Sequence, residues 1–431
     1  MLSVVKSIIP LRLQKLDFQL KTKFDTSNLN LWRIRKRQEN YLEYVKSKDK
    51  INVVFLVIHD SVWKYEMVYK LFKDDKRFNV KVAIIPLVRF GIAQFETYTQ
   101  SLDYFASNGY EVIETFDGNT KTWIDVETVF DPDIVFFTNP HKLTFDKYYI
   151  DAFKYKLTCY VPYAFVVIHS IEMHYNQAIF FKLWKYFLET PSHLDYAKKY
   201  MPGQTKHLMV TGYPSLDRIF QDDYKPKQVW KELKEETFKI IWAPHHTISG
   251  QGSGLDYSSF MAYSEYFIQL LQARSDLQIV FKPHPLLKEK LYKDKSWGQE
   301  KTDSYYQKWD MLENGQLEVG PYIDLFYESD AMIMDSASFL AEYQYFNKPM
   351  LFTTIDDDVI GRFNSFGQTI FDIVYKGKDT SDIRNFIDDV VVKGKDTLRG
   401  DRMAFFDKYI RQDSSKTASE KIYEELVKVL C

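Results

Sequence analysis

Continuous apolar runs recur along the chain, and longer charged or amphipathic segments separate them. The first run, INVVFLVI, begins at Ile51. Four more runs follow it in the first half of the chain, at residues 80–87, 133–139, 158–163 and 208–214. Apolar runs of this length are typical of parallel strands buried on both faces, and the segments between them have the length and polarity of helices. The alternation predicts a doubly wound α/β domain.

The same alternation begins again after a polar stretch, Gln221 to Glu236, which we interpret as a linker followed by a helix. The strand-like runs of this second half lie at residues 238–244, 277–283, 331–336 and 349–354. A last helix is predicted from about Ser414 to the end of the chain. The sequence therefore predicts two α/β halves, each a Rossmann-like doubly wound parallel sheet. Two such domains facing a cleft form the GT-B arrangement.

The two ends of the chain are predicted to lie outside these sheets. Residues 1–50 have a net charge of +7 and carry apolar residues at a loosely helical period, which Pro10 interrupts. Such a segment is either a basic amphipathic arm that lies on an anionic membrane surface or a helical arm that packs on the body of the protein. We expect residues 51–220 and 221–400 to form the two domains and residues 401–431 to form helices that pack back on them.

Composition and charge exclude several classes of protein. The chain has 431 residues, of which 45% are hydrophobic, so it can bury more than one core and is not disordered. No apolar run approaches the roughly 18 residues of a membrane-spanning helix. Lys6 and Arg12 interrupt the apolar start of the chain, which therefore does not resemble a signal peptide. With only Cys159 and Cys431, the sequence excludes a disulfide scaffold and indicates a reduced, cytoplasmic protein.

Histidines directly follow several of the predicted strands. Four of the nine histidines have this position: His59, His245, His246 and His284. Ligands of open α/β sheets bind at the carboxyl ends of strands, and an imidazole there can act as a general base or bind a phosphate. One such histidine alone is more often structural. Their shared position is what indicates a site.

A serine-containing turn, Asp335-Ser336-Ala337-Ser338, follows the strand at residues 331–336 and precedes a helix-like segment. Ser336 or Ser338 is predicted to cap that helix, whose N–H groups and hydroxyls would bind an anion such as a diphosphate. Glu342 lies one turn further, where its carboxylate would accept hydrogen bonds from a ribose diol. An ordinary helix cap and a solvated glutamate are the alternative interpretations.

Other nucleotide-binding and metal-binding motifs do not occur in the sequence. It contains no Gly-rich P-loop, no G-x-G-x-x-G after the first strand and no H-E-x-x-H. His245 and His246 lack a nearby cysteine or a second cluster of histidine and carboxylate, and the acidic run 356–358 is interpreted as a solvated turn. We therefore predict neither a metal nor a cofactor.

Five segments, taken in order, carry a family resemblance. They are TGYPSLD (211–217), IIWAPHHT (240–247), FKPHPLL (281–287), YIDLFYESDAMIMDSAS (322–338) and AEYQYFNKPMLF (341–352). Together they resemble the CDP-glycerol glycerophosphotransferase family, whose members build poly(glycerol phosphate) teichoic acids and related capsules. The resemblance implies a GT-B fold and the transfer of an alditol phosphate from a CDP-activated donor to a hydroxyl, with release of CMP.

The resemblance also implies roles for individual residues. His284 matches the family's HP histidine, which is expected to contact the diphosphate as a catalytic residue. His246 and Thr247 stand where the family has a Trp and an Arg, and Glu342 stands where it has an Asp. The residues assigned to donor binding are His245, His246, Thr247, Lys282, Ser336, Ser338 and Glu342.

The family's other catalytic histidine belongs to a W-H-G-T motif in the first domain, and this sequence has no such motif. The nearest segment, residues 162–174, supplies His169 and His174 without the glycine. His59, His169 and His174 therefore stay open as candidates for the general base. The resemblance implies that the first domain, residues 51–220, binds the acceptor and the second, residues 221–400, binds the nucleotide donor.

The leading hypothesis from the sequence is an alditol phosphate transferase that assembles a capsule, a teichoic acid-like polymer or a lipopolysaccharide at the inner face of the cell membrane. Its expected partners are a CDP-alditol or other nucleotide-activated donor, a glycan or lipid-linked acceptor, and an anionic membrane surface for residues 1–50, with no nucleic acid. A GT-B glycosyltransferase with a nucleotide-sugar donor and a non-catalytic partner of a polysaccharide assembly complex are the alternatives.

Overall fold

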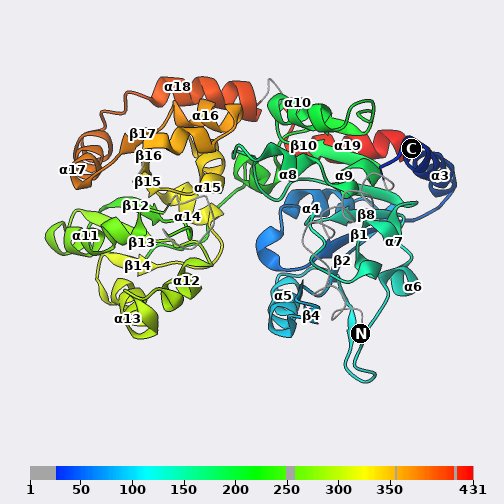
Figure 1. Cartoon of the computed structure of the whole chain (residues 1–431), viewed down its shortest axis with the longest axis horizontal. Coiled ribbons are helices and arrows are strands. Elements are labelled where there is room, and N and C mark those ends of the chain that lie inside the picture. The colour runs from blue at the N-terminus through cyan, green and yellow to red at the C-terminus, as the bar shows by residue number, and fades with distance from the viewer. Residues whose placement is uncertain (1–25, 249–257, 355–356, 412–414, 431) are drawn as a thin grey trace, which may run out of the picture. The chain divides into compact units, whose positions relative to one another are not determined.

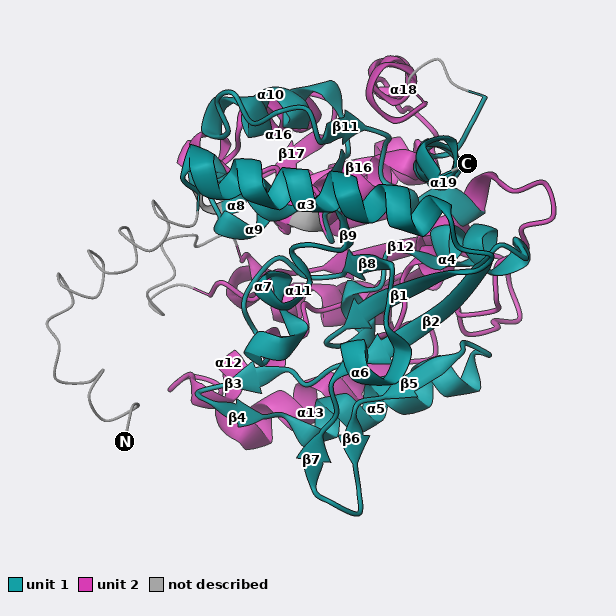
Figure 2. Cartoon of the chain, turned by 90° about the vertical axis from the view of Figure 1, so that its right-hand side faces the viewer, with its two compact units in different colours: residues 1–163, 171–218, 415–431 teal, residues 164–170, 219–414 magenta. Residues whose placement is uncertain are grey.

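The chain folds into two compact units (Figures 1 and 2). The computed structural model describes residues 26–248, 258–354, 357–411 and 415–430. Unit 1 comprises residues 1–163, 171–218 and 415–431, and unit 2 comprises residues 164–170 and 219–414. Each unit is an α/β structure built around one parallel sheet, as the alternating apolar runs predict.

Unit 1 contains a seven-stranded parallel sheet in the order β11-β10-β9-β8-β1-β2-β5. Its strands are β1 (Ile51–Val57), β2 (Phe78–Ile84), β5 (Val112–Glu114), β8 (Ile134–Phe137), β9 (Leu157–Tyr160), β10 (Lys185–Leu188) and β11 (Leu208–Val210). Two short hairpins, β3 (Val88–Arg89) with β4 (Ile92–Ala93) and β6 (Phe116–Asp117) with β7 (Thr122–Trp123), lie outside this sheet. In the central strand β1, Val53, Phe55 and Val57 on one face are buried, and so are Val54 and Leu56 on the other. Burial of both faces explains the continuous run INVVFLVI.

Nine helices belong to unit 1 among the described residues. They are α3 (Asn28–Lys46), α4 (Glu66–Asp74), α5 (Phe95–Ser107), α6 (Val126–Phe130), α7 (Ile150–Phe153), α8 (Ile171–Tyr175), α9 (Ala178–Lys182), α10 (Pro191–Tyr200) and α19 (Ala418–Leu430). Helix α3 packs on the unit, because Gln38 donates hydrogen bonds to the carbonyls of Lys154 and Lys182, both at 2.9 Å. Residues 28–46 of the predicted basic arm therefore pack on the protein, and residues 1–25 lie outside the described residues.

Unit 2 contains a six-stranded parallel sheet in the order β14-β13-β12-β15-β16-β17. Its strands are β12 (Phe238–Ala243), β13 (Leu277–Phe281), β14 (Gly315–Leu317), β15 (Ala331–Met334), β16 (Met350–Thr353) and β17 (Tyr375–Gly377). Its helices are α11 (Phe260–Ala273), α12 (Leu287–Lys293), α13 (Gly298–Met311), α14 (Ile323–Glu328), α15 (Ala337–Glu342), α16 (Ser365–Phe371), α17 (Thr380–Asn385) and α18 (Arg399–Phe405). Trp242 of β12 is fully buried and stacks on Phe267 and Phe281, with ring centroids 4.3 and 5.0 Å away.

A short strap, residues 164–170, belongs to unit 2 although its neighbours in the sequence belong to unit 1. The N–H of His169 donates to the carbonyl of Arg362 at 2.9 Å, and the N–H of Asn364 donates to the carbonyl of Val167 at 2.9 Å. A Cβ atom on Gly367 would lie 2.4 Å from that same Val167 oxygen, so the close approach of the strap requires glycine at this position.

Two details differ from the sequence-based expectation. The helix predicted within Gln221–Glu236 is wrong, because these residues form turns and extended backbone. Pro226 lacks a donor and disfavours a helical conformation at Lys225, and Trp230 is the one apolar side chain of the stretch that is fully buried. The last helix begins at Ala418 and not at Ser414. No helix among the described residues is long and apolar enough to cross a membrane.

Candidate functional site

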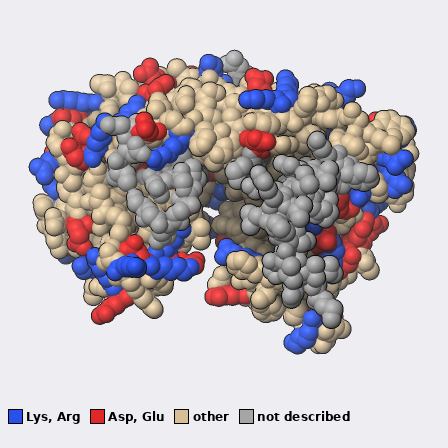
Figure 3. All heavy atoms as spheres, in the orientation of Figure 1, with Lys and Arg blue, Asp and Glu red and all other residues tan. Residues whose placement is uncertain are grey.

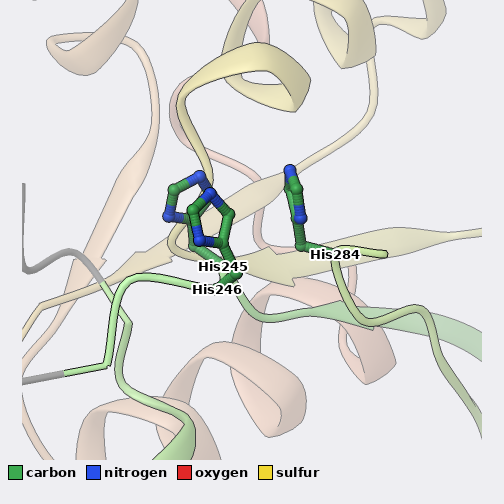
Figure 4. A group of neighbouring side chains, drawn as sticks. All are labelled: His245, His246 and His284. Carbon is green, nitrogen blue, oxygen red and sulfur yellow. The ribbon is translucent and has the colours of Figure 1, made fainter. Parts of the chain in front are cut away.

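Three histidines meet at the carboxyl ends of the neighbouring strands β12 and β13 in unit 2 (Figure 4). His245 and His246 follow β12, and His284 follows β13. One ring nitrogen of each lies within 4.8 Å of a ring nitrogen of the other two. The ring centroids of His246 and His284 are 4.2 Å apart, and those of His245 and His246 are 4.3 Å apart. The structure thus brings together three of the histidines that the strand-end pattern singles out.

Backbone donors fix which ring nitrogen carries the proton in two of these histidines. The N–H of Leu286 donates to Nδ1 of His284 at 3.1 Å, and the N–H of Thr247 donates to Nδ1 of His245 at 3.3 Å. A backbone N–H only donates, so Nδ1 must be the unprotonated nitrogen and the neutral ring carries its proton on Nε2. His245 and His284 are therefore hydrogen-bond donors at Nε2, which suits the oxygen atoms of an anion.

All three imidazoles are neutral near pH 7. Burial, together with the smaller effects of the charges of His246 and His284, lowers the pKa of His245 to about 2. Burial likewise lowers the pKa of His246 to about 4 and that of His284 to about 3. Lys290 of α12 lowers the pKa of each ring as well, because its ammonium disfavours a second positive charge nearby. Lys290 therefore places a positive charge beside neutral hydrogen-bond donors.

A buried carboxyl group, Asp335, positions the loop that carries His245. It directly follows β15 and accepts hydrogen bonds from the N–H of His245 and from both the N–H and the hydroxyl of Ser259, the last at 2.7 Å. Complete burial raises the pKa of Asp335 to about 6 despite these donors. Three donors on one buried carboxyl fix the backbone of the His245 loop.

Lys282 and Thr247, which the sequence also assigns to donor binding, lie in the same unit. The ammonium of Lys282 donates to the carbonyl of Gly320 at 2.5 Å, and burial lowers its pKa to about 8. Thr247 is buried, with its hydroxyl 2.8 Å from Nδ1 of His245. Thr247 therefore orients His245.

Helix α15 carries the other predicted donor-binding residues. Ser336 has the N-cap position, but its side chain does not bond to the first turn of this six-residue helix. The side chain of Ser338 lies outside those that the structure describes. Glu342 is buried and accepts a hydrogen bond from the hydroxyl of Tyr322. Glu342 is therefore not the solvated residue of the alternative interpretation.

The three candidates for the general base are divided between the two units. His59 follows β1 in unit 1, where Nδ1 lies 2.6 Å from the hydroxyl of Ser61. His169 is exposed on the strap of unit 2. His174 lies on α8 of unit 1, where burial and the charge of His141 lower its pKa. His141 is absent from the candidates chosen from the sequence, although its place shortly after β8 follows the same strand-end pattern.

By distance alone, the three histidines of unit 2 could hold a metal ion, and they are the one such group in the part of the chain that the structure describes. A metal bound at Nε2 requires the proton on Nδ1. In His245 and His284 that proton would point at the backbone N–H of Thr247 and Leu286. The three imidazoles therefore fit an anion better than a metal ion. The absence of a metal stays a prediction, and these hydrogen bonds support it.

Comparison with known proteins decides the family. The sequence profile of CDP-glycerol:poly(glycerophosphate) glycerophosphotransferases matches residues 181–428, more than half of the chain, including both strand ends that carry the three histidines. The chain belongs to this glycerophosphotransferase family. The resemblance predicted from five sequence segments is thereby confirmed.

Two curated relatives from Staphylococcus aureus (strain NCTC 8325 / PS 47) match part of the chain. The teichoic acid ribitol-phosphate polymerase TarL is 25% identical over 189 residues, which cover 39% of this chain and 31% of TarL. The ribitol-phosphate polymerase TarK is 24% identical over 189 residues, which cover 39% of this chain and 34% of TarK. The matched region is thus about a third of the length of either relative.

Solved structures confirm the predicted GT-B fold. A variant of the wall teichoic acid polymerase TagF has a TM-score of 0.56 at 13% identity, covering 96% of this chain and 97% of that one. Staphylococcus aureus MnaA with UDP has a TM-score of 0.55 at 16% identity, covering 89% of this chain and 97% of that one. At these identities the likeness establishes the fold alone.

Proposed function

We propose that this glycerophosphotransferase family member moves an alditol phosphate from a CDP-activated donor to a hydroxyl of a cell-surface glycan and releases CMP. The observation that carries the proposal is the pair of Nε2–H donors, on His245 and His284, beside Lys290 in unit 2. The relatives support it, since TarL and TarK are named as ribitol-phosphate polymerases and a TagF structure with a TM-score of 0.51 was soaked with CDPG.

Unit 2 would bind the donor through its diphosphate. The anionic oxygens accept hydrogen bonds from Nε2 of His245 and His284, and Lys290 compensates their charge. On the face drawn in Figure 3, cationic and anionic side chains of the described residues are interspersed. On that face the described side chains do not form the long basic track that a nucleic acid requires.

The reaction needs positioning and charge compensation more than covalent catalysis. The oxygen of the acceptor hydroxyl attacks the phosphorus that carries the alditol, in line with the bridging oxygen of the diphosphate. The bond from that phosphorus to the bridging oxygen breaks, and the oxygen leaves as part of CMP. Neutral imidazole donors suit this step because they stabilise negative charge on the leaving phosphate without taking up a proton.

The proposal assigns the acceptor, a glycan or a lipid-linked glycan, to unit 1. It also includes association with the inner face of the membrane through the basic N-terminal arm. Because α3 packs on unit 1, the test of this part deletes residues 1–25 and measures sedimentation with anionic vesicles. Unchanged sedimentation of the shortened protein would remove the membrane association from the proposal and leave the transfer reaction standing.

Nucleotide binding is the first test of the function. Thermal stabilisation and calorimetry are measured with CDP-glycerol, CDP-ribitol and UDP-N-acetylglucosamine on the wild type, on His284→Ala and on a control, Lys293→Ala, whose side chain is exposed in the same unit. We expect binding of the cytidine compounds, with an affinity about 10- to 100-fold lower in His284→Ala, because one hydrogen bond to a charged oxygen is lost. The control should bind as the wild type does.

The product nucleotide then identifies the reaction. A phosphotransferase that attacks phosphorus releases CMP, whereas a glycosyltransferase that attacks the sugar carbon releases a nucleoside diphosphate. CMP formed from a CDP-alditol would support the proposal. UDP formed from a UDP-sugar would replace it with the glycosyltransferase, and binding without turnover of any donor would favour the non-catalytic partner.

A further inference from the structure

A second histidine cluster lies in unit 1, at the carboxyl ends of β8 and β9. His141 follows β8, Tyr163 follows β9, and these strands are parallel neighbours in the sheet. Nε2 of His141 lies 3.5 Å from the hydroxyl of Tyr163, and the two ring centroids are 6.2 Å apart. His174 on α8 is the second imidazole, and it lies near enough to His141 for the charge of His141 to lower the pKa of His174.

The backbone beneath this cluster is rigidly connected. The buried hydroxyl of Tyr65 donates to the carbonyl of Phe137 and accepts from the N–H of Val161, both at 2.8 Å, so it joins the end of β8 to the end of β9. The hydroxyl of Tyr213 donates to the carbonyl of Tyr163 at 3.0 Å. Fixed strand ends hold the two rings in place before any ligand arrives, which catalysis by proton transfer requires.

Both imidazoles are neutral near pH 7, so each retains a ring nitrogen that can accept a proton. Burial lowers the pKa of His141, while a hydrogen bond with Gln177 raises it. Burial and the charge of His141 lower the pKa of His174 to about 4, and His141 is the ring whose Nε2 faces the hydroxyl of Tyr163. Two charged residues lie close to the cluster in the sequence: Lys142, which pairs with Asp146 at 2.6 Å, and Glu172, which is exposed on α8.

Buried polar groups occur in the same unit as the cluster. The hydroxyls of Tyr175 and Thr211 are buried, and neither has a hydrogen-bond partner among the described residues. Glu189 directly follows β10 and acts electrostatically on Tyr175 and on Tyr160 at the end of β9. Buried hydroxyls that lack a protein partner are rare and are commonly satisfied by water or by a ligand. A polyol or sugar supplies hydroxyl groups of that kind.

We propose that the cluster of His141, Tyr163 and His174 binds the hydroxyl of the acceptor and that His141 is the general base of the reaction. This inference rests on the proposed phosphotransfer. The acceptor O–H bond breaks and its proton moves to Nε2 of His141, while the oxygen forms a bond to the donor phosphorus. The bond between that phosphorus and CMP breaks, and CMP leaves with the electron pair. His141 then gives the proton to solvent.

The test measures CMP release from CDP-glycerol, with water and with molar glycerol as the attacking hydroxyl compound. We expect His141→Ala to lower kcat about 10²- to 10⁴-fold and to leave donor affinity unchanged. Added imidazole should restore part of the rate, and the acid limb of the pH profile of kcat should disappear in the variant. Tyr163→Phe should lower kcat about 10-fold, whereas the control Tyr155→Phe, on the same unit and 38% exposed, should behave as the wild type does.

Two results would overturn the inference. A kcat of His141→Ala within threefold of the wild type shows that another group takes the proton, and a loss in His59→Gln or His169→Gln would then assign the base there. Loss of donor affinity in His141→Ala, without rescue by imidazole, shows a structural role. If the wild type binds CDP-glycerol but never forms CMP, both the proposed function and this inference are wrong. If the wild type and His141→Ala both release CMP at the normal rate, only this inference is wrong.

Discussion

Each unit places histidines at the carboxyl ends of its parallel strands, yet the groups that contact the ring nitrogens differ between the units. In unit 2, the backbone N–H groups of Leu286 and Thr247 donate to Nδ1 of His284 and His245. In unit 1, His141 contacts the side chains of Tyr163 and Gln177. A backbone donor fixes the tautomer permanently, whereas a side chain that donates or accepts leaves it adjustable. The same residue type therefore has a fixed tautomer in one unit and an adjustable one in the other.

One buried carboxyl group in each unit sharpens this comparison. Glu189 directly follows β10 of unit 1, and Asp335 directly follows β15 of unit 2. Burial raises the pKa of Glu189 to about 8 but that of Asp335 only to about 6, since the donors on Asp335 stabilise its charged form. Near pH 7 unit 1 therefore contains a neutral carboxylic acid and unit 2 a carboxylate.

The largest expected effect concerns Glu189→Gln. The pKa of Glu189 is about 8 in the folded protein and near 4.5 in the unfolded chain. The free energy of unfolding of the wild type therefore falls as the pH rises from about 4.5 to about 8. The loss amounts to several kcal/mol, at about 1.4 kcal/mol for each unit of pKa. Glutamine imitates the neutral acid, so the variant should lose little stability between pH 5 and pH 8.5. Urea unfolding at both pH values measures this, and an equally steep fall in the variant would contradict it.

The next effect concerns Asp335→Ala in unit 2. The N–H of His245 and the N–H and hydroxyl of Ser259 lose their acceptor, which should lower the free energy of unfolding by about 3 kcal/mol. Nucleotide binding should weaken as well, because the loop of His245 loses its anchor. Asp389→Ala, which removes an exposed pair with Lys393, is the control and should change stability by less than about 0.5 kcal/mol. Equal stability of the two variants would show that Asp335 does not position the loop.

A smaller effect separates the two nitrogens of His284. The amide nitrogen of glutamine reaches the place of Nε2, whereas that of asparagine reaches only the place of Nδ1. We expect His284→Gln to bind CDP-glycerol within about threefold of the wild type and His284→Asn to bind about 10- to 100-fold more weakly. Calorimetry measures both affinities. Equal weakening in the two variants would mean that the ring acts otherwise than as a donor at Nε2.

The smallest expected effect is that of zinc. Because two of the three rings in unit 2 accept backbone N–H groups at Nδ1, micromolar Zn²⁺ should change Tm by less than about 1 °C. A specific site filled to 1,000 times its Kd would add about 4 kcal/mol. A rise in Tm of several degrees in the wild type that is absent from His245→Ala would show that the rings rotate and bind metal. The histidines of unit 2 would then not have the fixed tautomers that distinguish them from His141.

The sequence predicts the sheets well because their signal is local. INVVFLVI and the later apolar runs mark strands that are buried on both faces, and the meeting of His245, His246 and His284 follows from their places after neighbouring parallel strands. Asp335 escapes this reasoning, because its hydrogen bond with the loop of His245 joins segments that are 90 residues apart in the chain. His169 and His174 are five residues apart, yet the strap assigns them to different units. Their proximity in the sequence therefore does not place the two histidines in the same unit.

The assignment of α19 to unit 1 has a consequence for the order of folding during synthesis. Ile422 and Leu426 of α19 are part of the same apolar core as Phe72 of α4, and the N–H of Ser419 donates to the buried carboxylate of Asp217 at 2.6 Å. A ribosome makes residues 219–414 of unit 2 before it makes α19, so unit 2 has its complete sequence while unit 1 still lacks a helix. A nonsense codon near residue 415 would therefore damage the part of the protein that was translated first.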